Sequence, residues 1–191
     1  MKAVSDLERF PRPAVAVDLA ILTVTDAGSS PELRILTQPR TDPDGRALPG
    51  AFLRERTTVA ETADHVLREK VKITPHETIR PRLLRLFDDP ARDERTWAVS
   101  VAHALSLPES ALLGADGELT RVTADGRLDG VGSLLFDHDA IVDAAIRDVR
   151  ERYEIRLRYL DVAPDPDGFL PEPFTLHQLR RVHEAVIGEE L

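Results

Sequence analysis

The order of strand-like and helix-like hydrophobic patterns constrains the fold more than any other feature of the sequence. The run from Val15 to Val24 is almost wholly apolar, so it predicts a buried strand, and a turn links it to a second strand at Glu32–Thr37. Further strands are predicted at Leu83–Phe87 and Thr96–Leu105, and a strand-like stretch at Ile155–Val162.

Three segments carry helix signals. Thr58 and Glu61 form a T-x-x-E capping box that begins a helix over Thr58–Val71. A second helix is predicted over Asp137–Tyr153, and a third over Leu176–Ile187, which a capping box begins and Gly188 ends. The order is strands, helix, strands, helix and a separate last helix, which favours an α+β fold with a C-terminal appendage.

Charge and composition narrow the functional class. The net charge is −9, so phosphate of nucleic acid repels the chain unless its basic residues gather on one face. There is no cysteine, which excludes disulfides and thiolate metal sites. The N-terminal residues lack the apolar stretch of a secretory signal, and no apolar run could span a bilayer. We therefore expect a cytoplasmic protein without a membrane partner.

One loop and the helix after it resemble the Nudix family. The loop reads Leu48-Pro49-Gly50-Ala51-Phe52-Leu53 and leads into the Thr58 helix. The family's box is G-x5-E-x7-R-E-U-x-E-E-x-G-U, where U is apolar. Its helix presents carboxylates that hold divalent cations, which neutralise a diphosphate and activate water.

The box is degenerate in this chain. Its defined positions fall, in order, on Ala51, Thr57, His65, Val66, Leu67, Glu69, Lys70, Lys72 and Ile73. Glu69 alone remains of the metal-facing carboxylates, Val66 offers no oxygen, and Lys70 puts a positive charge where a cation would lie. We expect no metal site, no catalytic residue and no cofactor, with Mg²⁺ needed only if the chain is a hydrolase after all.

Three further segments resemble Nudix-related transcriptional regulators of bacterial NAD metabolism. They are Phe87–Asp93 with Val99–Ala102, Leu135–Ile141, and Phe174–Gly188. The resemblance implies a Nudix α/β/α sandwich with a mixed sheet over residues 1–155 and a partial winged-helix segment, of the DNA-binding type, over residues 156–191. It also implies a homodimer and a nucleotide effector such as ADP-ribose. In that family the chain continues into a basic helix and a wing, so we expect DNA binding only with a complete winged helix.

Candidate ligand-binding residues surround the box, where the family holds its ligand. They are Arg40, Arg46, Phe52, Arg54 and Glu69. Arginine suits bidentate recognition of phosphate, although each of these arginines could equally be a solvated surface charge. Glu69 is more simply an exposed helix residue. Asp137-His138-Asp139 is interpreted as helix-cap chemistry, and the histidines show no metal-ligand spacing.

The preferred function is a non-catalytic sensor of an ADP-ribose- or NAD-related nucleotide, as part of a bacterial transcriptional regulator. The alternative is an active Nudix hydrolase of a nucleoside diphosphate derivative such as ADP-ribose, with Glu55, Glu61 and Glu69 as its carboxylates. A third reading is an interaction module whose pocket binds nothing.

Overall fold

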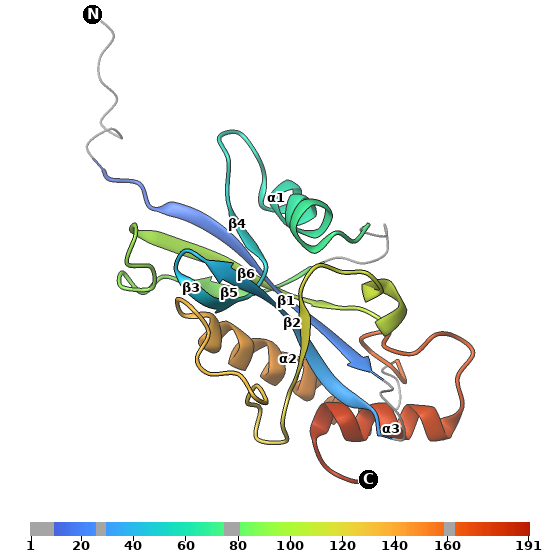
Figure 1. The fold of residues 1–191 in the computed structure, drawn as a ribbon. Helices are drawn as coiled ribbons and strands as arrows, with labels where there is room; N and C mark the ends of the chain where they lie inside the picture. The colour runs from blue at the N-terminus through green and yellow to red at the C-terminus, as the bar shows by residue number, and fades with distance from the viewer. Residues whose placement is uncertain (1–9, 26–29, 75–80, 159–162) are drawn as a thin grey trace, which may run out of the picture.

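A single mixed sheet forms the centre of the protein (Figure 1). The computed structural model describes residues 10–25, 30–74, 81–158 and 163–191. The main path of the sheet runs β3-β2-β1-β6-β5, with β4 paired to β1 and β7 paired to β2. β1 and β6 are parallel, whereas the other pairs are antiparallel. The strands are β1 (Ala14–Thr25), β2 (Glu32–Thr41), β3 (Asp44–Ala47), β4 (Gly50–Phe52), β5 (Arg82–Phe87), β6 (Ala98–Ser106) and β7 (Glu118–Arg121).

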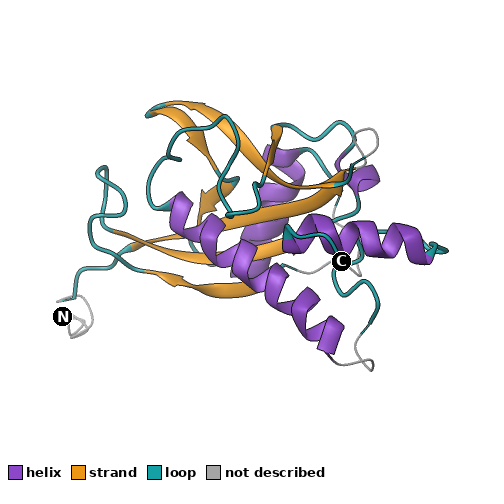
Figure 2. Cartoon of the chain, turned by 90° about the horizontal axis from the view of Figure 1, so that it is seen from below, coloured by secondary structure: helices purple, strands orange, loops and turns teal. Residues whose placement is uncertain are grey.

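Helices cover both faces of this sheet. On one face lies α1 (Val59–His65), which continues without a break into the π-helical turns of η2 (Val66–Val71). On the other face lie α2 (His138–Arg158) and α3 (Leu176–Ile187), which Figure 2 shows from below. A short 3-10 turn, η3 (Glu109–Leu112), follows β6. The predicted α+β architecture, with a mixed sheet between helices, is confirmed.

Strand β1 is apolar throughout because it serves two cores. Leu19 and Ile21 belong to the cluster under α1 and η2, whereas Ala20 and Leu22 belong to the cluster under α2 and α3. All four side chains are fully buried. A strand with both faces covered is a continuous apolar run and does not alternate, as the sequence predicts.

The first helix begins at its predicted position and buries one face against the sheet. The Thr58 hydroxyl accepts from the Glu61 amide, and the Glu61 carboxylate accepts from the Thr58 amide, which completes the capping box. Val66 and Leu67 are 0% and 1% exposed, which confirms their position in the core. The helix ends at Lys72, whose φ of 63° is left-handed.

One predicted strand differs from the structure. Ile155–Arg158 is not strand but the last turn of α2, while residues 159–162 lie outside the described part. The segment contains Arg156, Leu157 and Arg158, which are good helix formers, so the helix continues past the buried Tyr153. Between β2 and β3 the chain makes a tight hairpin, in which Thr41 pairs with Asp44.

The last helix packs on the same core as α2. Val182 and Val186 are buried in one cluster with Ile146 and Val149 of α2. The Arg150 Nε donates to the carbonyl of Val186 at 3.0 Å. The predicted boundary between residues 155 and 156 falls inside α2, and the division into two domains stays a prediction. No helix in the described part of the chain is long and apolar enough to cross a membrane.

Candidate functional site

A cavity of about 260 Å³ opens between β4, η2 and the segment before α2. Its charged lining consists of four cations and two carboxylates, namely Arg40, Lys70, Arg92, Arg95, Asp18 and Asp93. An adjoining cavity of about 340 Å³ shares part of this wall and extends it toward Asp42 and Pro43. In a chain of net charge −9, an excess of cations at one cavity favours an anionic ligand.

A buried charge network forms the floor of the cavity. Arg92 is 6% exposed and donates to both carboxylate oxygens of Asp137, at 2.7 and 3.0 Å, and to Asp18 Oδ2 at 3.3 Å. Ser100 Oγ donates to the same Asp18 oxygen at 2.7 Å. This network joins β1, β6, the loop after β5 and the start of α2, so it fixes the cavity's floor.

His138 completes the surroundings of Asp18. The Leu48 amide donates to His138 Nδ1 at 2.9 Å, so the neutral ring carries its proton on Nε2, which faces Asp18 Oδ2 at 3.6 Å. Burial raises the pKa of Asp18, but the His138 contact, the Ser100 hydrogen bond and the charge of Arg92 together outweigh it and hold that pKa below its ordinary value. Asp18 is therefore an ionised carboxylate whose partners are all protein groups.

Gly50 permits the close approach of β4 to Asp18. The two residues are paired in the antiparallel register of β1 and β4. A Cβ on Gly50 would lie 2.0 Å from Asp18 Oδ1, far inside any contact that a real side chain makes. The glycine of the Leu48-Pro49-Gly50 motif is thus required by a carboxylate that is distant in the sequence.

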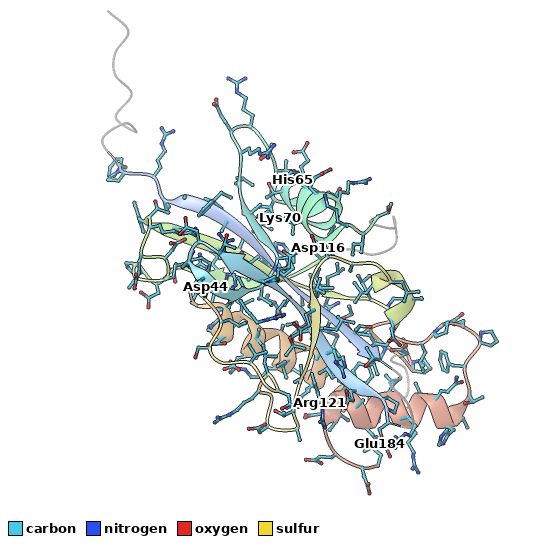
Figure 3. All side chains as sticks on the ribbon, in the orientation of Figure 1. Asp44, His65, Lys70, Asp116, Arg121 and Glu184 are labelled. Atoms are coloured by element: carbon cyan, nitrogen blue, oxygen red, sulfur yellow. The ribbon has the colours of Figure 1, made fainter. Side chains whose placement is uncertain are left out.

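Lys70 extends from η2 to this same point. Its ammonium donates to the Gly50 carbonyl. Figure 3 labels Lys70 on the sheet side of the helix. Burial of the side chain, together with the positive charge of Arg40, lowers the pKa of Lys70, and the negative charge of Asp18 partly opposes this. Lys70 therefore places a half-buried cation directly in the cavity wall.

The aromatic residue Phe136 also lines the cavity. Phe136 has a left-handed backbone, with φ 61°. Its ring lies under two guanidinium groups, 4.7 Å from Arg95 and 5.7 Å from Arg40. Asp93 in turn accepts two hydrogen bonds from the Arg95 guanidinium, at 2.8 and 2.9 Å. The ring and the arginines form a wall that is both apolar and cationic.

The residues at the box positions do not fit a divalent cation. Val66 is in the core, and Glu69 is exposed and pairs with Lys72 at 3.8 Å. Lys70 supplies an ammonium where oxygen ligands are needed. Across the described ranges, no group of three or more His, Cys, Asp or Glu side chains is placed to hold a metal. The left-handed Lys72 at the box's closing glycine position supports this register for the box.

The structure brings two of the five predicted ligand-binding residues to the cavity. Arg40 and Phe52 line it. Arg46 points elsewhere, toward Glu118 at 2.7 Å and the Thr37 hydroxyl. Arg54 and Glu69 are exposed and do not line the cavity. Contact of all five with a ligand stays a prediction.

Sequence reasoning missed most of the floor of the cavity. Asp137 does lie at the start of α2, where its carbonyl accepts from the Ala140 amide, but its carboxylate binds Arg92, and His138 is buried against Asp18. One signal was available for Asp18. A carboxylate in the middle of an apolar strand is costly to bury unless a partner compensates its charge, so it predicts such a partner.

Solved structures similar to this chain include Nudix proteins. No protein-family model matches the chain, and no curated protein matches it. A mutT/nudix family protein from Listeria innocua is 25% identical, with a TM-score of 0.63 over 76% of this chain and 99% of that chain. NrtR of Shewanella oneidensis is 23% identical, with a TM-score of 0.73 over 93% of this chain and 79% of that chain.

This chain has a Nudix-like fold. The NUDIX domain of NrtR has been solved with ADP ribose; it is 21% identical, with a TM-score of 0.59 over 76% of this chain and 94% of that chain. NrtR has also been solved with a 27mer DNA. Within the Nudix-like fold of this chain, the cavity lies where the Leu48-Pro49-Gly50 loop meets η2.

Proposed function

We propose that this chain is a non-catalytic Nudix-like sensor of an ADP-ribose- or NAD-related nucleotide, and part of a bacterial transcriptional regulator. The observation that carries the proposal is the cationic cavity, in which Lys70 occupies a box position that the family gives to a metal-binding glutamate. Such a wall can bind a diphosphate but offers nothing to activate water.

The chemistry of the two adjoining cavities suits a nucleoside diphosphate sugar. Guanidinium groups bind phosphate oxygens in bidentate fashion; Arg95 stands at the wall that the two cavities share, and Arg40 lines the first cavity. Phe136 and Phe52 offer apolar surface to a base or a ribose. The cocrystal of the NrtR NUDIX domain with ADP ribose supports this ligand class.

The alternative, an active hydrolase, lacks a suitable carboxylate set. Glu61 is engaged in the capping box, and Glu55 is 90% exposed beside Arg56. Glu69 pairs with Lys72 on the solvent side of η2. These three carboxylates do not line the cavity, whereas a metal-assisted hydrolysis needs its ligands beside the diphosphate.

Calorimetry with ADP-ribose tests the proposal. The full chain should bind ADP-ribose in EDTA, and chromatography should find no AMP after incubation with Mg²⁺. Arg40→Ala should weaken ADP-ribose binding about tenfold or more, because it removes one charge-assisted hydrogen bond. Arg127→Ala, which changes an exposed arginine outside the cavity, should leave the affinity unchanged. Arg46→Ala and Arg54→Ala in the same series decide whether those residues contribute. Mg²⁺-dependent AMP formation by the unmodified protein would establish the hydrolase instead.

We further propose a homodimer whose DNA binding needs a complete winged helix. The alignment with whole NrtR covers more of this chain than the alignment with its NUDIX domain, so part of the chain corresponds to structure outside that domain. In α3, both Arg180 and Arg181 pair with Glu184, at 3.2 and 3.1 Å, which leaves little net charge for phosphate.

An anisotropy titration with promoter fragments tests the DNA part, and sedimentation tests the dimer. Each phosphate contact adds about −0.9 to the slope of log affinity against log salt. Because α3 offers little net charge for such contacts, the 191-residue chain should bind DNA weakly and with a shallow salt dependence. Tight DNA binding with a steep salt dependence would contradict the proposal that DNA binding needs a complete winged helix.

A further inference from the structure

We propose that the ammonium of Lys70 replaces the divalent cation of a Nudix site and binds the ligand's diphosphate directly, so that binding needs no metal. The inference rests on the proposed function only in that the ligand carries a diphosphate. It assigns a ligand-binding role to Lys70, whose positive charge opposes the binding of a metal ion.

Hydrogen bonds fix both the backbone and the ammonium group of Lys70. Its backbone carbonyl accepts from Gln38 Nε2 at 2.8 Å, and its neighbour Val71 is buried in the core. Its ammonium donates to the Gly50 carbonyl at the cavity wall. An ammonium has three N–H groups, so the contact with Gly50 leaves two that can donate to ligand oxygens.

The surrounding charges favour an anion at this point. Arg40 stands on the same cavity wall, and its charge repels that of Lys70. A diphosphate between the two would relieve this repulsion, because each cation then faces an anion. Within the described residues, no ion pair joins Lys70 to a carboxylate, so its charge is available to a ligand.

The same charges oppose a metal ion. The two carboxylates of the lining are already engaged, Asp18 by Arg92 and Asp93 by Arg95. A divalent cation at this wall would meet the ammonium of Lys70 and the guanidinium of Arg40, and both carboxylates of the lining would have to leave their arginines to bind it. The cavity therefore suits a metal-free diphosphate.

Calorimetric titrations with inorganic pyrophosphate and with ADP-ribose, each in EDTA and in Mg²⁺, test the inference. The unmodified chain should bind both in EDTA, and Mg²⁺ should not improve the affinity. Lys70→Met keeps the length of the side chain but removes its charge, and it should weaken pyrophosphate binding about ten- to a hundredfold. Lys72→Met removes an exposed charge from the same helix end and is the matched control, with unchanged affinity.

A charge-reversal variant sharpens the test. Lys70→Glu should lose binding in EDTA and regain part of it in Mg²⁺, since a carboxylate then stands at the cavity wall. Circular dichroism melting confirms that each variant is folded, and the unmodified protein alone already tests the metal dependence. Pyrophosphate binding that requires Mg²⁺ in the unmodified chain, no pyrophosphate binding at all, or equal binding by Lys70→Met would each overturn the inference. Lys70-dependent pyrophosphate binding without ADP-ribose binding would refute the proposed effector and leave the role of Lys70 intact.

Discussion

Single residues determine the geometry of the cavity at the contact between β1 and β4. Asp18 is a buried carboxylate with three protein partners, Arg92, Ser100 and His138. Gly50 lies opposite it and has no side chain to displace it. The Gly50 carbonyl also receives the Lys70 ammonium, so a change at this one glycine would disturb both charged groups.

Replacement of Gly50 by alanine should destabilise the fold. The new Cβ would lie 2.0 Å from Asp18 Oδ1, so the strands or the carboxylate must move, at a cost of about 1–3 kcal/mol. Gly132→Ala is the control, because a Cβ there meets nothing within 4 Å and the backbone is not left-handed. Urea unfolding measures both variants. Equal midpoints for the two would show that β4 does not approach Asp18 so closely.

Asp18 should contribute to stability in a pH-dependent way. Its pKa in the folded chain is lowered, so its contribution is complete above the unfolded value of about 3.9 and is lost as the pH falls through the folded value. Asp18→Asn removes the charge and leaves Arg92 without one partner, at a cost of about 3 kcal/mol at pH 7.

The measurement is urea unfolding of both proteins between pH 7 and pH 3. The difference in unfolding free energy between wild type and Asp18→Asn should shrink below about pH 4, because Asp18 of the unfolded wild type then binds a proton, whereas the folded carboxylate stays ionised down to its lower pKa. Other carboxyl groups titrate alike in both proteins and cancel in the comparison. A difference that stays constant over the whole range would contradict an ionised Asp18.

At the scale of elements, the helix α1–η2 serves the core and the cavity at once. Leu67 and Val66 anchor it against the sheet, while Lys70 turns toward Gly50. Its beginning is set by the capping box at Thr58 and its end by the left-handed Lys72. A helix held at both ends and along one face can place a single cation reproducibly.

Truncation of Leu67 to alanine should cost about 2–5 kcal/mol, the usual range for a buried aliphatic side chain. The neighbouring Arg68→Ala, on the exposed face of the same helix, should change stability by less than about 0.5 kcal/mol. Guanidinium unfolding compares the two. A small effect of Leu67→Ala would mean that this helix does not pack on the sheet as described.

At the scale of the whole molecule, the sheet separates two hydrophobic clusters, and α3 contributes to only one of them. Val182 and Val186 of α3 pack with α2 and with residues of β1 and β2. This arrangement makes the C-terminal helix part of the same core as the sheet. We therefore expect the described chain to unfold in one cooperative transition.

The single tryptophan, Trp97, makes this testable, because it precedes β6 and reports on the sheet. Val186→Ala should lower the unfolding midpoint seen by Trp97 fluorescence by an amount that corresponds to about 2 kcal/mol. Leu176→Ala, in the same helix but 84% exposed, is the control and should leave that midpoint unchanged. A Trp97 midpoint that does not respond to Val186→Ala would support the predicted separate segment over residues 156–191.

The sequence by itself determined the elements whose signals are local. Both capping boxes, the Gly188 helix end and the doubly buried β1 depend on neighbouring residues or on a single hydrophobic period. The α+β class follows from their order. The error at Ile155–Arg158 has a local cause too, because alternating apolar residues beside good helix formers fit both a strand and the end of a helix.

Tertiary structure alone decided the cavity. Asp18, Gly50 and Arg92 belong to three distant segments, and only the registers of β1 with β4 and β6 bring them together. Arg40 could be predicted because it lies near the box in the sequence, whereas Lys70 could be aligned with the box but not placed against Gly50. Spacing along one chain fixes which side chains share a helix or strand face. It does not fix which faces meet, because that depends on how the sheet is paired and on where buried charges find their partners.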